Sequence, residues 1–133
     1  MQDEIHYALR QFKAAFRRLQ EGVQVADSAL LQDGVVQRFE FTFELLWKAL
    51  KVLLEDQGII ALTPKDCLQA AFRQGWIEDE RVFLQMLEAR NKMSHEYDES
   101  EARKVFRQIK KRFLKPMRTL LERLDKIRRK KAA

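Results

Sequence analysis

The apolar residues of this chain recur at the spacing of an α-helix, most clearly between residues 35 and 57. Within RFEFTFELLWKALKVLLEDQG the first six residues alternate between polar and apolar, as in a half-buried strand. Because helical stripes fit more positions over the whole stretch, we predict one helix from about Val35 to Gln57, covered on more than one side by bundle neighbours or a second subunit. The two stripes are a heptad seam of Phe39, Phe43, Leu46, Leu50 and Leu53, and beside it Phe41, Leu45, Ala49 and Val52.

Helix-start and helix-stop signals divide the rest of the chain into four further helical segments. We expect a loop around LLQDG, residues 30–34, with Asp33 capping the helix that follows and Gly58 ending it. Pro116 is expected to kink the last segment near its middle. The predicted segments run from Asp3 to about Ala26, from Thr63 to Gly75, from Asp79 to a last turn that carries Arg90, and from Asp98 toward the C-terminus.

Composition agrees with a helical protein. Only 4 Gly and 2 Pro occur among 133 residues, and 35% of the residues are charged. We predict a single domain, residues 1–133, folded as an all-α, up-and-down antiparallel bundle of four long helices and one short helix. Cys67 has no partner for an internal disulfide, and neither a leader nor a run of about 20 apolar residues is visible. We therefore expect a cytoplasmic protein with no membrane association.

The net charge of +6 is concentrated near the C-terminus. Residues 103–131 carry fourteen basic side chains and two acidic ones, a net charge of +12, and the segment ends in a basic tail over residues 126–133. Such a surface attracts phosphate backbones without sequence preference, which is consistent with RNA as a partner. The simpler interpretation is a solvated helix face with a ragged end, and charge alone does not decide between the two.

Most enzyme classes lack their sequence signatures here. The chain has no Gly-rich phosphate loop, dinucleotide fingerprint, GxSxG, CxxC pair or HExxH. With two histidines and one cysteine, we predict neither a metal site nor a cofactor. Glu44 and Lys48 stand at the spacing of an ordinary surface ion pair.

The stretch EARNKMSHEYDESEA, residues 88–102, holds the strongest candidate site, formed by Arg90, His95 and Tyr97. Five residues of continuous helix turn the chain by about 500°, which would leave positions 90 and 95 about 140° apart. Asn91 and Ser94 are weak helix formers, so we expect the helix to end between Arg90 and His95. The alternative is structural: cations complement the dipole at a helix end, and the tyrosine packs on the bundle rim.

RNKMSHEY resembles the R-x4-H-x-Y motif of HepT-type proteins in the HEPN superfamily. RFEFTFELLWKALK is similar to the second-helix signature of the branch named nucleotidyltransferase substrate-binding proteins, and the likeness spans about residues 3–125. It implies a compact helical homodimer with the two motifs near the two-fold axis, forming a composite cleft. Many such proteins are metal-independent endoribonuclease toxins, encoded beside a small nucleotidyltransferase that acts as antitoxin.

The resemblance also assigns roles to individual residues. Arg90 and His95 would be the catalytic pair, and Tyr97 would accept AMP from the partner nucleotidyltransferase, which would block the cleft. Side-chain chemistry adds that cleavage by such a pair would leave 2′,3′-cyclic phosphate ends and that Asn91 would orient the scissile phosphate. The basic last helix would hold the RNA backbone, at Lys104, Arg107 and Lys111.

Two alternatives stay open from the sequence. One is a non-catalytic subunit that binds a nucleotidyltransferase and presents substrate to it. The other is a purely structural helical dimer with a polyanion-binding tail. The intact set of Arg90, His95 and Tyr97 favours the ribonuclease, because a binding module would not need it.

Overall fold

The computed structural model describes residues 1–95 and 98–132, and the side chains of residues 95 and 132 lie outside that description. The prediction of an all-α fold is confirmed, since every regular element in these residues is a helix. Elements α5, η1 and α6 follow one another without a break and form the long last segment that the sequence predicts. The elements are α1 (Gln2–Val25), α2 (Ala29–Asp56), α3 (Pro64–Arg73), α4 (Glu80–His95), α5 (Glu99–Gln108), the π-helical turn η1 (Ile109–Phe113) and α6 (Leu114–Ala132).

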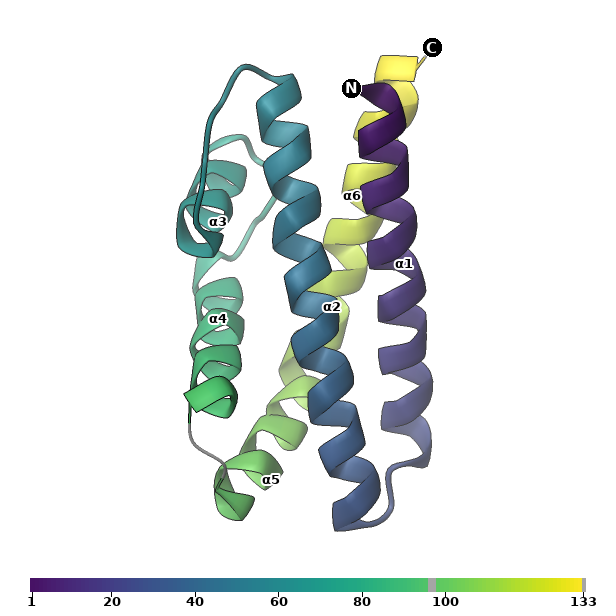
Figure 1. Ribbon diagram of the computed structural model, residues 1–133, viewed down its shortest axis with the longest axis vertical. Coiled ribbons are helices and arrows are strands. Elements are labelled where there is room, and N and C mark those ends of the chain that lie inside the picture. The colour runs from purple at the N-terminus through teal and green to yellow at the C-terminus, as the bar shows by residue number, and fades with distance from the viewer. Residues whose placement is uncertain (96–97, 133) are drawn as a thin grey trace.

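The long helices are arranged up and down, as predicted (Figure 1). In that view α1 descends, α2 ascends beside it, α4 descends on the left, and the last segment rises behind α2. The short α3 lies beside the upper part of α2, and the two ends of the chain meet at the top. Helix α2 therefore has neighbours on several sides, which explains why so much of its surface is apolar.

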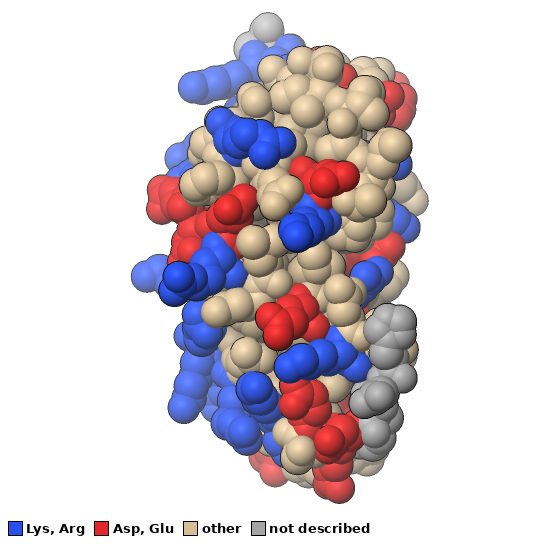
Figure 2. Space-filling view, turned by 90° about the vertical axis from the view of Figure 1, so that its left-hand side faces the viewer, with Lys and Arg blue, Asp and Glu red and all other residues tan. Residues whose placement is uncertain are grey.

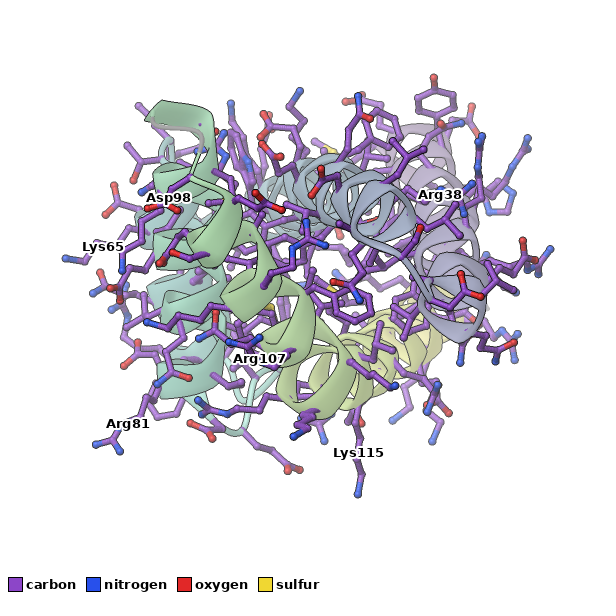
Figure 3. All side chains as sticks on the ribbon, turned by 90° about the horizontal axis from the view of Figure 1, so that it is seen from below. Arg38, Lys65, Arg81, Asp98, Arg107 and Lys115 are labelled. Carbon is purple, nitrogen blue, oxygen red and sulfur yellow. The ribbon has the colours of Figure 1, made fainter. Side chains whose placement is uncertain are left out.

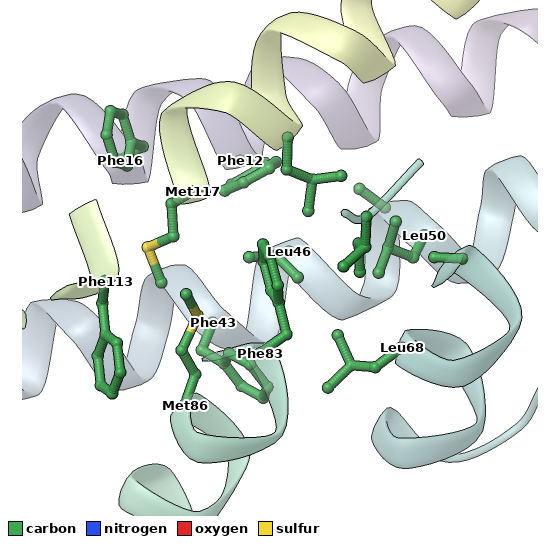
Figure 4. Packing of buried hydrophobic residues seen from close by; sticks show 14 of the residues in the cluster. Phe12, Phe16, Phe43, Leu46, Leu50, Leu68, Phe83, Met86, Phe113 and Met117 are labelled. Carbon is green, nitrogen blue, oxygen red and sulfur yellow. The ribbon is translucent and has the colours of Figure 1, made fainter. Parts of the chain in front are cut away.

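The heptad seam of α2 forms the centre of the core, as its spacing predicts. All five seam residues, from Phe39 to Leu53, have no exposed surface. Phe39 stacks on Phe113 of η1 with ring centroids 5.5 Å apart, and Phe43 and Phe113 both point into the core beside Met117 (Figure 4). The second stripe is only partly covered, because Phe41 remains 60% exposed.

Helix α2 begins six residues earlier than predicted, so LLQDG is helical and Asp33 is not its cap. The cap is Ser28, whose Oγ accepts a hydrogen bond from the Leu31 amide at 3.2 Å. Arg103 of α5 holds this first turn, donating to the Ala29 carbonyl at 3.0 Å and the Gln32 side chain at 2.6 Å, and pairing with Asp33. A contact between residues 70 positions apart therefore adds to the local Ser28 cap in stabilising this start, and the sequence prediction used neither.

Other predicted helix ends are confirmed. Gly58 and Gly75 adopt a positive φ of 81°, the left-handed conformation that glycine tolerates after a helix. At the opposite ends, Thr63 accepts from the Asp66 amide at 3.1 Å, and Asp98 accepts from the Ser100 amide at 2.9 Å. These caps account for the short connections around α3 and before α5.

The last segment is irregular just before Pro116. Its one π turn is closed by a hydrogen bond from the Leu114 amide to the Ile109 carbonyl, five residues back. Pro116 has no amide hydrogen, and in a regular α-helix its ring would crowd the carbonyl of Arg112, which lies four residues earlier and inside this turn. The expected disturbance near Pro116 thus takes the form of a π turn. Among the described residues, no helix has the length and apolarity to span a bilayer.

Candidate functional site

The motif residues Arg90, Asn91 and His95 lie on one helix. The expectation that α4 ends between Arg90 and His95 is wrong, because the helix continues through His95. Within this helix the Ser94 hydroxyl donates to the Arg90 carbonyl, four residues back, at 3.0 Å, so the side chain is satisfied without ending the helix. Tyr97 lies outside the described residues, as does the His95 side chain. Positions 90 and 95 are therefore about 140° apart around the axis of a continuous helix.

The Arg90 guanidinium faces α2 and is only 27% exposed. Its Nη2 donates to Glu44 Oε2 at 2.8 Å, which joins α4 to α2 by a charged hydrogen bond. Its Nη1 donates to Oδ1 of the neighbouring Asn91 at 3.1 Å. Arg90 is thus a cation held at the junction of two helices by side-chain partners on both.

Glu44 is held from several directions and is 32% exposed. Besides Arg90, Trp47 Nε1 donates to its Oε2 at 3.1 Å, and Lys48 Nζ lies 3.6 Å from its Oε1. Burial alone would raise the pKa of Glu44, but the Trp47 hydrogen bond and the charges of Arg90 and Lys48 outweigh it and lower the pKa. The carboxylate therefore stays ionised at neutral pH.

Glu40 stands one turn before Glu44 on α2 and differs from it electrostatically. Burial raises the pKa of Glu40, and the positive charge of Arg90 only partly opposes that shift. Arg90 thus lies near two carboxylates, and Glu44 is the one that accepts a hydrogen bond from it.

The sequence prediction missed the link between Glu44 and Arg90. The expected pair of Glu44 and Lys48 is present, but the shorter contact runs to Arg90, 46 residues away. Trp47 was also missed as a donor to Glu44. A signal did exist, because Glu44 and Trp47 both belong to the FELLWKALK signature and stand three residues apart, where helical side chains meet.

A polar hollow lies on the other side of α4, facing α5. Its lining includes Lys104 together with Lys92, which pairs with Glu88 at 3.7 Å and Glu101 at 3.4 Å. Lys104 is exposed beside it and is the one predicted RNA contact that borders α4. Arg90 points away from this hollow toward α2, so the two features occupy different sides of the helix.

The predicted RNA contacts Lys104, Arg107 and Lys111 belong to a larger group of exposed cations. In the part of the chain that the structure describes, these cations have no acidic partner within ion-pair distance, although Arg118 lies over the Phe16 ring. Lys and Arg gather along one edge of the view in Figure 2, and Lys115 points outward in Figure 3. We call this group the basic surface: Lys104, Arg107, Lys110, Lys111, Arg112, Lys115 and Arg118.

The C-terminal basic tail differs from the basic surface. Helix α6 continues to Ala132, so the described part of the tail is helical. Its Arg128 and Arg129 pair with Asp125 at 3.1 and 2.8 Å, and Lys131 pairs with Asp56 at 2.6 Å. Two carboxylates therefore offset part of the positive charge that the sequence places at the C-terminus.

Two other kinds of reactive site, a nucleophilic cysteine and a metal centre, find no support in the described residues. Burial raises the pKa of the Cys67 thiol to about 11, so Cys67 is not a thiolate at neutral pH. Among residues 1–95 and 98–132, no group of three His, Cys, Asp or Glu side chains is arranged to hold a metal ion. The candidate site therefore rests on Arg90 and the polar side chains that contact it.

Known proteins share this helical arrangement and its sequence. The family model described as nucleotidyltransferase substrate binding protein like matches residues 7–126. A probable ribonuclease HepT of Haemophilus influenzae is 34% identical over 113 residues, covering 72% of this chain and 77% of that protein.

Two solved structures are also similar. A protein of Thermus thermophilus has a TM-score of 0.78 and 34% identity, over 85% of this chain and 98% of that one. A Haemophilus influenzae structure, described as revealing the fold of a substrate-binding domain of a nucleotidyltransferase, has a TM-score of 0.77 and 34% identity, over 88% and 98%. With its family signature in α2 and its R-x4-H motif in α4, this chain belongs to the nucleotidyltransferase substrate-binding-like family and is a homologue of the HepT ribonuclease.

Proposed function

We propose that this protein is a HepT-like, metal-independent endoribonuclease and the toxin of a toxin–antitoxin pair. The observation that carries the proposal is Arg90, a partly shielded arginine fixed by Glu44 and Asn91, on the same continuous helix as His95. The similarity to a probable ribonuclease HepT supports the assignment. The experiment that tests it is RNA cleavage without metal ions.

The two side chains suit cleavage next to a ribose 2′-hydroxyl. His95 would accept the proton of that hydroxyl, whose oxygen forms a bond to phosphorus while the bond to the 5′-oxygen breaks and that oxygen takes a proton from water. Arg90 would stabilise the charge on the non-bridging oxygens. The products would carry a 2′,3′-cyclic phosphate and a 5′-hydroxyl.

A second copy of the chain completes the proposed site. On a continuous α4 the positions of Arg90 and His95 are about 140° apart, so one helix does not bring both to the same phosphate. In a two-fold dimer with the α4 ends near the axis, Arg90 of one chain would approach His95 of the other. We therefore propose a homodimer with composite clefts.

Regulation would come from a partner nucleotidyltransferase acting as antitoxin. We propose Tyr97 as the acceptor of AMP, two residues beyond His95. An adenylyl group there would occupy the cleft and repel an RNA phosphate, because it adds bulk and negative charge. The likeness to a nucleotidyltransferase substrate-binding domain supports a partner of this kind.

The direct test is incubation of a labelled RNA pool with the unmodified protein in EDTA. We expect fragments with 2′,3′-cyclic phosphate and 5′-hydroxyl ends, identified by their response to phosphatase and kinase. A His95→Ala preparation of equal purity controls for contaminating nucleases. Equal cleavage by both preparations, or none by either, would contradict the proposal.

The basic surface should bind the RNA backbone. Replacing Lys104, Arg107 and Lys111 by glutamine should weaken binding of single-stranded RNA and reduce the salt slope by about 2, because each lost phosphate contact removes about 0.7. Binding is measured by fluorescence anisotropy at several salt concentrations, in a His95→Ala background that prevents cleavage.

The matched control removes the same charge from cations that already have acidic partners. Arg128, Arg129 and Lys131 are replaced by glutamine, and we expect a smaller loss of affinity because their charge is largely neutralised. If both triple variants lose affinity equally, net charge attracts RNA and the basic surface is not a specific contact.

A second function is favoured by the family description. The chain would act as a non-catalytic subunit that presents substrate to a nucleotidyltransferase, as the matching family model and the Haemophilus influenzae structure are described. This second function predicts that the chain does not cleave RNA. It also predicts that adding the chain increases the activity of a nucleotidyltransferase on its substrate. The cleavage assay and this stimulation assay separate the two functions.

A further inference from the structure

The orientation of Arg90 is determined mainly by α2. Arginine carries a long side chain with several rotatable bonds, so an exposed one samples many orientations. Here the 2.8 Å contact to Glu44 fixes one edge of the guanidinium, and the 3.1 Å contact to Asn91 restrains the other nitrogen. Of the five N–H groups, these contacts use two, which leaves three for an incoming anion.

Glu44 is itself fixed before it contacts Arg90. Trp47, one turn further along α2, donates its indole N–H to the same Oε2 that accepts from Arg90. Lys48 lies 3.6 Å from the other oxygen. Because these partners all come from one rigid helix, the carboxylate has a defined position against which Arg90 is aligned.

We propose that Glu44 is a positioning residue for the reaction, holding Arg90 where it meets the non-bridging phosphate oxygens, with Trp47 orienting Glu44. This inference rests on the proposed ribonuclease function. Glu44 does not touch the substrate in this scheme. Its effect on the reaction passes through the direction of the guanidinium fork, whose planar geometry matches two phosphate oxygens only when it is correctly oriented.

The ion pair between Glu44 and Arg90 should have opposite effects on RNA binding and on catalysis. Glu44 neutralises part of the Arg90 charge, so it reduces the general attraction of the site for RNA. It also prevents Arg90 from turning toward Glu40, the second carboxylate one turn away, whose own pKa Arg90 already influences. Loss of Glu44 should therefore reduce turnover while leaving RNA affinity equal or higher.

The test compares steady-state cleavage by wild type, Glu44→Gln, Glu44→Asp and Trp47→Phe. Glutamine keeps the size but loses the charge, and we expect kcat to fall about 10- to 100-fold, with KM unchanged or lower. Aspartate keeps the charge but is shorter, and Trp47→Phe leaves Glu44 less well oriented. The kcat values of Glu44→Asp and Trp47→Phe should therefore lie between those of wild type and Glu44→Gln. Glu55→Gln, on the exposed face of α2, removes the same charge and should retain wild-type kcat.

A second readout does not depend on cleavage. In wild type, nitrogen NMR should show slow rotation about the Cζ–Nη bonds of Arg90, and in Glu44→Gln the Nη signals should average. Trp47→Phe provides the same comparison if Glu44→Gln does not fold, as judged by circular dichroism.

The outcomes separate the two proposals. If wild type cuts RNA and Glu44→Gln cuts it with the same kcat, or loses activity only through a higher KM, the positioning role is wrong and the ribonuclease stands. If folded wild type does not cut RNA, both the ribonuclease and the role of Glu44 in it are overturned, whatever the NMR signals show. Averaged Arg90 signals in wild type would contradict the fixed orientation by themselves.

Discussion

Replacing either Arg90 or His95 by alanine should lower the rate of RNA cleavage by about 10²- to 10⁴-fold, the usual range for removing a general base or a charge-stabilising donor. Both variants should keep the fold. Arg90 lies at the helix junction with 27% of its side chain exposed, outside the apolar core. The measurement is the initial cleavage rate of a labelled RNA, with circular dichroism as the check on folding.

Mixing the two inactive variants tests whether the cleft is composite. If Arg90 of one chain works with His95 of the other, a heterodimer of Arg90→Ala and His95→Ala contains one cleft with both residues and one with neither. An equal mixture that exchanges subunits should therefore recover about a quarter of wild-type activity, since half of the dimers are mixed.

The result without recovery is equally informative. If subunits exchange, as shown by differently tagged chains, and the mixture remains inactive, each cleft must take both residues from one chain. That would contradict the dimer geometry inferred from the continuous α4. A strict monomer in sedimentation that still cuts RNA would contradict it as well.

Truncating Phe39 to alanine should reduce the free energy of unfolding by about 3–5 kcal/mol, the usual cost of emptying a buried phenylalanine site. Phe39 has no exposed surface, stacks on Phe113 at 5.5 Å and lies 6.3 Å from Phe43. It therefore joins α2 to the middle of the last segment. Urea unfolding followed by circular dichroism measures the change, provided that the slope with denaturant stays constant.

Phe41 is the matched control, because it is the same residue type two positions along the same helix. It is 60% exposed, and its replacement by alanine should change the free energy of unfolding by about 0.5 kcal/mol or less at low protein concentration. A strand would place Phe39, Phe41 and Phe43 on one face and make both truncations costly. Equal losses at Phe39 and Phe41 would contradict the helical packing described above. A Phe41 effect that grows with protein concentration would place this residue against a second copy.

The fold could be predicted largely because apolar spacing is a local property. The α2 seam, the caps at Thr63 and Asp98 and the stop at Gly58 depend on residues close together in the chain, and the structure contains them all. The predicted start of α2 was wrong because Asp33 and Gly34 look like a turn locally. Arg103, far away in sequence, binds that segment as helix.

The candidate site was only partly predictable for the same reason. Arg90 and His95 were proposed from the R-x4-H-x-Y motif, and Asn91 and Ser94 suggested a helix end between them that does not occur. Intrinsic preferences of about half a kcal/mol are a weak signal that the packing of a whole helix overrides, and the Ser94 hydroxyl finds an acceptor in the Arg90 carbonyl inside that helix. The contact between Arg90 and Glu44 depends on how two helices pack, and a single sequence does not show it.

The π turn explains how the last segment keeps one continuous apolar seam despite its spacing. Ile109, Phe113 and Met117 are all fully buried, although the two successive steps of four residues advance an α-helix by about 800°, or 80° beyond two full turns. A π turn accommodates about one extra residue, which takes about 100° off this rotation and leaves Met117 within about 20° of the direction of Ile109, facing the core. The bundle thus stores a one-residue difference in length in the winding of a helix, where most folds would place it in a loop.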